Sequence, residues 1–224
     1  MPGTRLRVTD ARVLCVEELE AGDAFLATVV EGVHAAGNPY LDYLFGAPDV
    51  TRGVLHAWVR RRSSEVSAHR ARVLQTGGRI AGGYLLLSGD DLRRSRSADL
   101  LALLTARGPV SRAEMQARLA ATRNAFGVVE PGDAYLSKIW VSDEFRGRGI
   151  SRALVSSLLA LASSWGAARV VLDVHAGNAP AIALYTRAGF ERVSHQRTEV
   201  PALEYLTLAR TLGAAPGERS PDYG

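Results

Sequence analysis

Residues 139–159 read IWVSDEFRGRGISRALVSSLL: an apolar strand-like run, a turn with two glycines and a helical pattern in direct succession. In its second half Ile150, Leu154 and Leu158 recur every four residues, which is typical of an amphipathic helix. Glycines permit backbone angles that other residues avoid, and the first N–H groups of a helix have no partner within it. The segment therefore predicts a strand, a tight turn and a helix N-terminus that can bind an anion such as a diphosphate.

Two better-known phosphate motifs do not account for this turn. Gly147-Arg148-Gly149 lacks the GxGxxG spacing of dinucleotide-binding turns, and no Gly-Lys-Ser/Thr sequence follows it. Arg146, Arg148 and Arg152 add positive charge beside the expected helix terminus. An ordinary glycine turn between a strand and a helix is the alternative interpretation of these residues taken alone.

Hydrophobic periodicity predicts further strands and helices on both sides of this segment. Before it we expect a strand at 12–17, helices at 18–36 and 50–63, a hairpin at 72–89 and a strand at 134–141. After it we expect a strand at 169–174, a helix at 179–187 and strands near 190–199 and 203–209. In the hairpin, Thr76-Gly77-Gly78 forms the turn, and the paired Gly82-Gly83 indicates a bulge or a close backbone approach.

Residues 90–132 interrupt the alternation of strands and helices. The stretch DDLRRSRS is polar, whereas LLALLTARG and SRAEMQARLAATRNAF predict helices, the second with Ser111 and Glu114 as a capping box. We therefore predict a single domain over 1–210 with a helical insertion at about 90–132, followed by a flexible tail at 211–224.

Composition argues against several classes of protein. The 224 residues are 47% hydrophobic, which is unlike a disordered chain, and a single cysteine, Cys15, excludes an internal disulfide framework and a multi-cysteine zinc site. We expect Cys15 to be a buried structural thiol. The first residues lack the apolar core of a signal peptide, and the most apolar later stretch, 153–172, contains Gly166 and Arg169. We expect a cytoplasmic protein that does not enter a membrane.

The positive charge comes almost entirely from arginine. Lys and Arg together number 27 against 23 Asp and Glu, for a net charge of +4, and Lys138 is the only lysine. The arginines are scattered rather than gathered into a stripe with aromatic residues, which argues against a nucleic-acid partner. The histidines show no metal-ligand spacing with cysteines or carboxylates, so we expect no metal.

The stretch VVLDVHAGNAPAIALYTRAGFERV, residues 170–193, strengthens the interpretation of the glycine turn. Asn178 can cap a helix that has Pro180 in its first turn, Gly189 suits the C-terminus of that helix, and Phe190 opens the next strand. This order of features predicts a second strand–helix–strand unit directly after the first.

Arg146-x-x-Gly149-x-Ser151, followed by Asn178, Tyr185 and Gly189-Phe190, resembles the GNAT superfamily of acyl-CoA-dependent N-acyltransferases. The family motif is Gln/Arg-x-x-Gly-x-Gly/Ala, from which Ser151 departs while remaining small. The resemblance is strongest over 134–195. It implies an α/β fold with a mixed, mostly antiparallel central sheet, a splay between two strands and flanking helices.

The resemblance also implies where acetyl-CoA is held. In this family the strand before the turn binds the pantetheine arm through backbone groups, the turn and helix terminus bind the diphosphate, and the Asn178 position approaches the pantetheine. The residues at matching positions are Ile139, Trp140, Val141, Arg146, Gly147, Arg148, Gly149, Ile150, Ser151, Arg152, Asn178 and Tyr185.

Tyr185 matches the tyrosine often proposed in this family to protonate the departing CoA thiolate, a task for which a phenol is suited. The acceptor ammonium, with a pKa of about 10.4, must also lose a proton before it attacks. Asp173 lies where bacterial N-terminal alanine acetyltransferases of this superfamily carry a proposed basic glutamate, and strand alternation puts His175 on the same face. A water chain is the third candidate for the base, because Tyr135 and Ser137 on the neighbouring strand are poor bases.

The resemblance places the acceptor beside the first pair of helices, where GNPYLDYLFGAPD, residues 37–49, predicts a loop. We expect Tyr40, Tyr43 and Phe45 to form an apolar wall and Asp42 to attract a cationic amine, with simple packing between helices as the alternative.

We predict direct transfer of an acetyl group from acetyl-CoA to a primary amine of a small molecule. One alternative is a protein N-terminal or lysine acetyltransferase, which needs an open groove, whereas a lid formed by 90–132 favours a small acceptor. Another alternative is a non-catalytic acyl-CoA-binding regulatory domain. The sequence leaves the acceptor, the acyl length and the oligomeric state open, a homodimer included.

Overall fold

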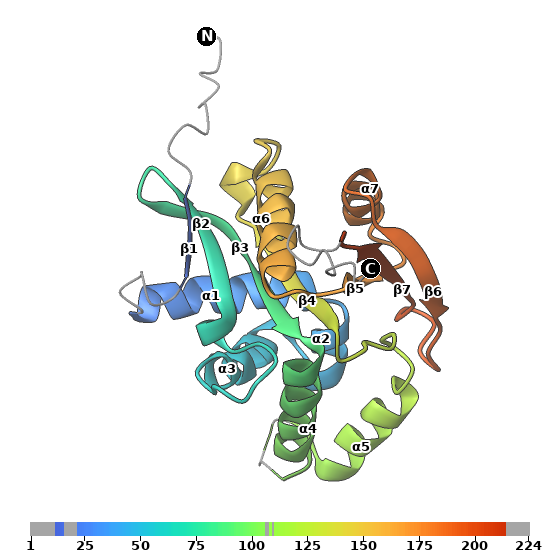
Figure 1. Ribbon diagram of the computed structural model, residues 1–224. Helices are drawn as coiled ribbons and strands as arrows, with labels where there is room; N and C mark the ends of the chain where they lie inside the picture. Colours follow the sequence, from blue (N-terminus) through green and yellow to red (C-terminus); the bar gives the residue numbers. More distant parts are fainter. Residues whose placement is uncertain (1–11, 16–21, 106–107, 109, 214–224) are drawn as a thin grey trace, which may run out of the picture.

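The computed structural model describes residues 12–15, 22–105, 108 and 110–213, which form one seven-stranded sheet with helices on both faces (Figure 1). Several expectations fall outside these residues: the end of the first strand (16–17), the start of the first helix (18–21), the side chain of Cys15 and the tail from 214 onward.

The sheet is mixed and mostly antiparallel. Its strands are β1 (Arg12–Cys15), β2 (Ala71–Thr76), β3 (Arg79–Ser88), β4 (Asp133–Val141), β5 (Arg169–His175), β6 (Glu191–Gln196) and β7 (Tyr205–Thr211). They lie in the order β1-β2-β3-β4-β5-β7-β6, and β4–β5 is the parallel pair. The predicted fold class is thus confirmed, and the parallel pair sits at the centre of the sheet.

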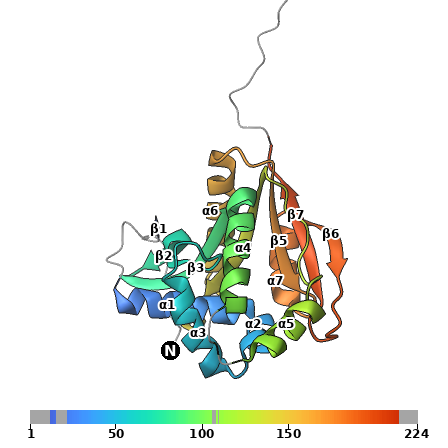
Figure 2. The same cartoon turned by 90° about the horizontal axis from the view of Figure 1, so that it is seen from below.

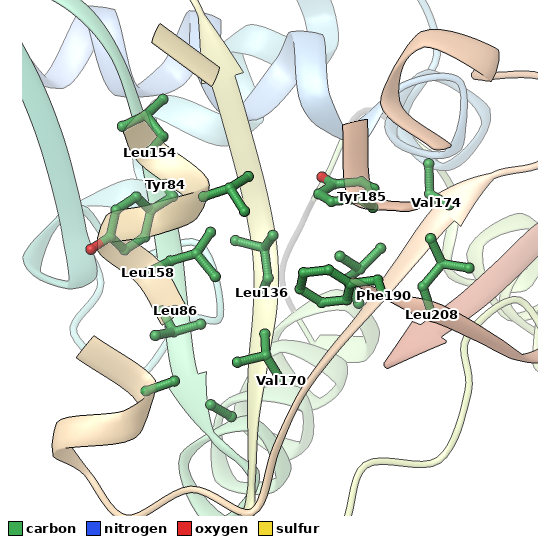
Figure 3. Close-up of a cluster of buried hydrophobic side chains, with 14 of the residues drawn as sticks. Tyr84, Leu86, Leu136, Leu154, Leu158, Val170, Val174, Tyr185, Phe190 and Leu208 are labelled. Carbon is green, nitrogen blue, oxygen red and sulfur yellow. The ribbon is translucent and has the colours of Figure 1, made fainter. Parts of the chain in front are cut away.

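Helices cover the two faces of the sheet in two groups. They are α1 (Asp23–Gly37), α2 (Tyr40–Phe45), α3 (Pro48–Val59), α4 (Gly89–Thr105), α5 (Arg112–Ala121), α6 (Ile150–Ser164) and α7 (Ala179–Arg187), with short 3-10 turns η2 (Ala68–Arg70) and η3 (Asp143–Phe145). On one face Leu154 and Leu158 of α6 pack against Leu136 and Val170 of the central strands (Figure 3). On the other, α1 packs against β4, and α3, α4 and α5 lie together on the side from which Figure 2 is viewed.

The segment expected to be a loop is partly helical. Residues 37–49 contain α2, which begins after Pro39 and ends at Gly46, where φ is +108°. The polar stretch 90–97, in the range of the expected helical insertion, belongs to α4. Ser88 Oγ accepts a hydrogen bond from the N–H of Asp91 (3.1 Å) and thereby caps this helix. None of the helices in the described ranges is long and apolar enough to cross a membrane.

The two central strands part halfway along their length. They pair from Asp133↔Arg169 to Leu136↔Leu172, after which β4 continues to Val141 and pairs with none of the described residues on its β5 side. Opposite β3, the register shifts so that Leu86 faces Leu136 and Leu85 faces Lys138, leaving Ser137 as an extra residue. This bulge turns Ser137 and Lys138 toward the same face, because the alternation of side chains resumes one residue later.

The expectation for the Gly82-Gly83 pair is also confirmed. A Cβ on Gly83 would lie 2.6 Å from Cζ2 of Trp140, and a Cβ on Gly82 would collide with the Trp140 carbonyl oxygen. The register between β2 and β3 shifts at the same place, with Leu74 opposite Gly82 and Gln75 opposite Ile80. Both a close approach and a bulge are therefore present.

Candidate active site

The glycine turn between η3 and α6 presents a row of unpaired backbone donors. Gly147 and Gly149 have φ values of +74° and +82°, which favour glycine strongly over other residues. Within the described residues, the N–H groups of 147–151 donate to no acceptor, whereas the N–H of Arg146 donates to Asp143 O (3.2 Å). We call this row of free donors at the helix terminus the anion cradle, and the binding of an anion to it stays a prediction. Such a row at a helix terminus suits a diphosphate.

Exposed arginines surround this cradle. Arg146 pairs with Asp143 (2.7 Å), Arg148 lies over the ring of Phe145 (5.6 Å), and Arg152 lies in the first turn of α6. Phe145 itself is buried and anchors the turn to the core. The positive charges are held beside the free N–H groups, where an anionic ligand would meet both.

The unpaired edge of β4 leads from this turn to the centre of the sheet. Ile139 and Val141 pack toward the α6 face, whereas the side chain of Trp140 is buried on the α1 face. The part of β4 that a ligand can reach is therefore its backbone edge beyond Leu136. The resemblance assigns the pantetheine arm to this edge. Asn178, at the start of α7, accepts a hydrogen bond from the N–H of Ala181 (3.2 Å) and so is the predicted helix cap.

Tyr185 projects from α7 into the core on the α6 side of the sheet. It is 5% exposed, and its ring makes an edge-to-face contact with Phe190 at 5.6 Å. Figure 3 shows its hydroxyl turned toward β4, and that hydroxyl makes no hydrogen bond to any described residue. Burial raises the pKa of Tyr185, so the phenol keeps its proton at neutral pH, as a proton donor must. Gly189, with φ of +81°, ends α7 as predicted.

On the opposite face, a cavity of about 220 Å³ opens at the point where the strands part. Its walls are mostly apolar and come from α1 to α5, and its floor comes from β4, β5 and β7. The lining residues are Ala36, Gly37, Tyr40, Leu41, Leu44, Phe45, Leu55, Trp58, Glu65, Val66, Arg96, Asp99, Leu100, Leu103, Leu119, Phe126, Tyr135, Ser137, Lys138, Asp173 and Tyr205.

Of the four residues predicted to bind the acceptor, Tyr40 and Phe45 line this cavity. Asp42 lies outside its lining, and its carboxylate is held by His34 Nε2 (2.9 Å) and Asn38 Nδ2 (2.8 Å). Burial raises the pKa of Asp42, but these hydrogen bonds outweigh it and keep the pKa below its ordinary value. Tyr43 also lies outside and carries Arg118 over its ring. Two of the three aromatic residues expected in the wall thus line the cavity, and they belong to a helix.

Asp173 lies on the floor of the cavity and is firmly held. Its Oδ1 accepts hydrogen bonds from Thr207 Oγ1 (2.7 Å) and the N–H of Gly127 (3.0 Å), and its Oδ2 accepts one from the Tyr135 hydroxyl (3.0 Å). Oδ2 retains capacity for another donor. Asp173 and Tyr185 therefore lie on opposite faces of the sheet, on either side of the parted strands.

His175 shares the face of Asp173, as alternation along β5 requires, but it does not line the cavity. Its Nδ1 accepts a hydrogen bond from the N–H of Gly177 (3.2 Å), which assigns the proton to Nε2, and Nε2 donates to Ala202 O (2.9 Å). Both ring nitrogens are thus occupied, which favours a structural role.

Sequence reasoning did not identify a buried ionic cluster in the cavity. Glu65, from the segment between α3 and η2, accepts hydrogen bonds from Ser137 Oγ (2.6 Å) and Arg96 Nε (3.2 Å), and it lies 3.9 Å from Lys138 Nζ. Burial raises the pKa of Glu65, but the charges of Arg96 and Lys138 outweigh burial and hold the pKa below its ordinary value. Burial lowers the pKa of Lys138, and the Glu65 carboxylate opposes that shift. The clue in the sequence was that Lys138 is the only lysine.

The fold and the site together define a class: an α/β protein with parted central strands, an anion cradle at a helix N-terminus and a cavity across the sheet. A comparison with family models agrees, since the acetyltransferase (GNAT) family matches residues 55–190. Because this match covers more than half of the chain, the chain belongs to the GNAT family.

Individual relatives support this assignment over shorter stretches. An uncharacterized N-acetyltransferase of Mycobacterium tuberculosis is 39% identical over 59 residues, 26% of this chain and 38% of that protein. The [ribosomal protein bS18]-alanine N-acetyltransferase of Escherichia coli is 35% identical over 72 residues, 32% of this chain and 49% of that protein. The chain thus spans half or less of the length of these curated relatives.

Solved structures share the fold at low identity. An N-acetyltransferase from Staphylococcus aureus has a TM-score of 0.60 at 18% identity, with 84% of this chain and 96% of that chain covered. The ribosomal-protein-S18-alanine N-acetyltransferase of Escherichia coli has a TM-score of 0.53 at 17% identity, covering 94% and 98%.

Proposed function

We propose that this protein transfers an acetyl group from acetyl-CoA to the primary amine of a small molecule. The observation that carries the proposal is that the inserted helices wall the cavity: Leu100 and Leu103 of α4 and Leu119 of α5 all line it. A cavity of about 220 Å³ suits a ligand smaller than the drug-sized molecules that occupy roughly 300–1,000 Å³. A cytoplasmic location, expected from the sequence, stays a prediction.

The residues on the α6 side fit acetyl-CoA. The free N–H groups of 147–151 and the arginines beside them would hold the diphosphate, and the unpaired edge of β4 would hold the pantetheine. A Bacillus subtilis acetyltransferase of similar fold, with a TM-score of 0.50 at 12% identity, was solved in complex with CoA. When bound, acetyl-CoA supplies the acetyl group as a thioester. Backbone N–H groups on the β4 edge are suited to stabilise negative charge on a thioester oxygen.

Two side chains on opposite faces supply the proton transfers. Asp173 attracts the acceptor ammonium through Oδ2 and receives its proton, directly or through a water molecule. Tyr185 holds a proton on the other face, where a departing thiolate would need one. His175 is not needed for either step, because both of its ring nitrogens are hydrogen-bonded elsewhere.

Acetylation of a protein N-terminus is the second candidate. It is favoured by the relatives named for the alanine of ribosomal protein bS18. A peptide acceptor requires its chain to leave the site, so α4 and α5 would have to leave a passage open. The two functions therefore differ in the size of acceptor that the cavity admits.

A thiol-release assay with acetyl-CoA separates these functions. The purified protein is offered small primary amines, peptides with N-terminal alanine and lysine-containing peptides with a blocked N-terminus, and released CoA is compared with a control lacking acceptor. We expect the highest kcat/KM among the small amines. A preference for the alanine peptides would overturn the small-molecule assignment, and acetyl-CoA binding without transfer to any acceptor would indicate a non-catalytic domain.

A further inference from the structure

Arg96 lines the cavity, and we call the two terminal nitrogens of its guanidinium group the guanidinium fork. Its Nε donates to Glu65 Oε2 (3.2 Å), while its two terminal nitrogens donate to no group of the described residues, although Arg96 lines the cavity. Its side chain keeps 34% of its surface accessible. An arginine fixed at Nε with free terminal nitrogens presents the geometry that binds a carboxylate.

Two aromatic rings hold this fork in place. The Arg96 guanidinium carbon lies 4.9 Å from the ring centroid of Tyr135 and 5.4 Å from that of Phe126. Stacking on two rings and a hydrogen bond to Glu65 leave the side chain little freedom. The fork is therefore preorganised, and a ligand anion would lose less affinity to side-chain ordering.

The charges of the cavity are divided between two places. Arg96 and Lys138 share the carboxylate of Glu65, while Asp99 and Asp173 are the other carboxylates in the lining. Asp173 stands apart from the cationic cluster of Arg96 and Lys138 and has no cationic side chain among its hydrogen-bond partners. Tyr135 contacts both the cationic cluster and Asp173: the Arg96 guanidinium stacks on its ring, and its hydroxyl donates a hydrogen bond to Asp173 (3.0 Å). A ligand with a cation and an anion a few bonds apart matches this division.

Other polar groups in the cavity agree with a polar ligand. The Tyr205 hydroxyl is buried and has no hydrogen-bond partner in the described residues, and Tyr205 is 6% exposed. Buried hydroxyls without partners are uncommon, and Tyr205 is one of the residues that line the cavity. Asp99 also lines the cavity: its Oδ2 accepts from the N–H of Glu65 (2.8 Å) and Ser64 Oγ (3.2 Å), whereas its buried Oδ1 makes no hydrogen bond to the described residues.

We infer that the acceptor is an amino acid with an apolar side chain, bound with its carboxylate on Arg96 and its amine at Asp173. The apolar walls from α1 to α5, such as Leu41, Phe45 and Leu103, would bury the side chain. This inference rests on the proposed function, since it specifies the acceptor for that reaction.

Matched pairs of acceptors test the inference. Wild-type protein is assayed with L-phenylalanine against L-phenylalaninamide and with L-leucine against L-leucinamide. The amine of an amino acid amide is less basic than that of the free amino acid, so a larger fraction of it is unprotonated at neutral pH. Amine reactivity therefore favours the amide, and a preference for the amino acid must come from recognition of its carboxylate. We expect kcat/KM to be about 10- to 100-fold higher for the acid, the range for a hydrogen bond between charged groups.

Variants then assign the preference to the fork. Arg96→Gln should abolish the preference mainly through KM for the acids, and Arg96→Lys should retain part of it. Arg94→Gln is the matched control, because Arg94 lies on the same helix, is 72% accessible and pairs with Asp91. If Arg96→Gln does not fold, Arg96→Lys and the wild-type acid–amide ratios decide the question.

The outcomes distinguish the two proposals. Acetylation of the amides at rates equal to the acids, or an unchanged preference in Arg96→Gln, would overturn the carboxylate site and leave the acetyltransferase proposal standing. If no amine is acetylated, the proposed function fails, and calorimetric titration with L-phenylalanine and its amide still tests the site. Tighter binding of the acid, lost in Arg96→Gln, would support it; equal or no binding of both would overturn it.

Discussion

Replacing Glu65 by glutamine removes the negative charge from a buried cluster and leaves Arg96 and Lys138 without a counter-ion. The glutamine carbonyl can replace Oε2 and accept from Arg96 Nε, which lies 3.2 Å from that oxygen, while the glutamine amide replaces Oε1 and can donate to Ser137 Oγ, which lies 2.6 Å from it. Breaking a buried ion pair by removing one partner costs about 3–5 kcal/mol. The retained hydrogen bonds and the partial exposure of Arg96 place the expected loss at the lower end, about 3 kcal/mol. For a protein of this size that corresponds to a decrease in Tm of about 6–12 °C.

Urea unfolding of Glu65→Gln beside Glu31→Gln measures this loss. Glu31 pairs with Arg52 on the surface, and its side chain is 60% accessible, so its replacement should cost less than about 1 kcal/mol. Because the folded protein holds the pKa of Glu65 below its ordinary value of 4.5, the stabilisation is complete above that value and is lost as pH falls through the folded pKa. The difference between wild type and Glu65→Gln should be constant from pH 8 to 5.5 and shrink below pH 4.5. A loss no larger than that of Glu31→Gln would refute the reasoning.

Three further perturbations address the reaction and the cradle. Tyr185→Phe should lower kcat by about 10²- to 10⁴-fold with little change in acetyl-CoA affinity, and an unchanged kcat would remove this tyrosine from the mechanism. Asp173→Asn should lower kcat/KM most at low pH, where the amine is protonated, so an equal effect at every pH would argue against its role as base. Gly149→Ala, at a φ of +82°, should cost about 1 kcal/mol and weaken CoA binding in a titration. Gly53→Ala, in a helix with open space around the added methyl, should instead stabilise the protein by about 0.5–1 kcal/mol, and equal effects of the two would contradict the role of φ.

The backbone geometry of the glycine turn and of α7, where we propose that acetyl-CoA binds, could be predicted because it is local. The positive φ values of Gly147 and Gly149, the cap at Asn178 and the end of α7 at Gly189 all involve residues close together in the chain. Short-range rules for turns and caps therefore identify these features. The same rules predicted the hairpin turn at Gly77-Gly78, where both φ values are positive.

The acceptor side depends on contacts between distant segments and was largely missed. The insertion brings Arg96 of α4 to Glu65, 31 residues away, and the bulge at Ser137 turns Lys138 inward. An alternating pattern does not show a bulge, so the strand sequence alone could not place both residues in one cavity. Arg96 is also one of 26 arginines and lies in a stretch that looks fully solvated. Its place in the cavity is set by tertiary contacts, which no local pattern encodes.

The cluster of Glu65, Arg96 and Lys138 is difficult to explain by stability alone. Apolar residues of similar volume usually stabilise a protein interior as well as a buried ion pair does, or better. Here the surrounding walls are already apolar, so leucine or methionine would pack at these positions without any need for charge. Apolar residues at these positions would remove the paired charges and the terminal nitrogens of Arg96 that donate to no described residue. The presence of three partly buried charges in the cavity is therefore better explained by recognition of a charged acceptor than by the folding of the sheet.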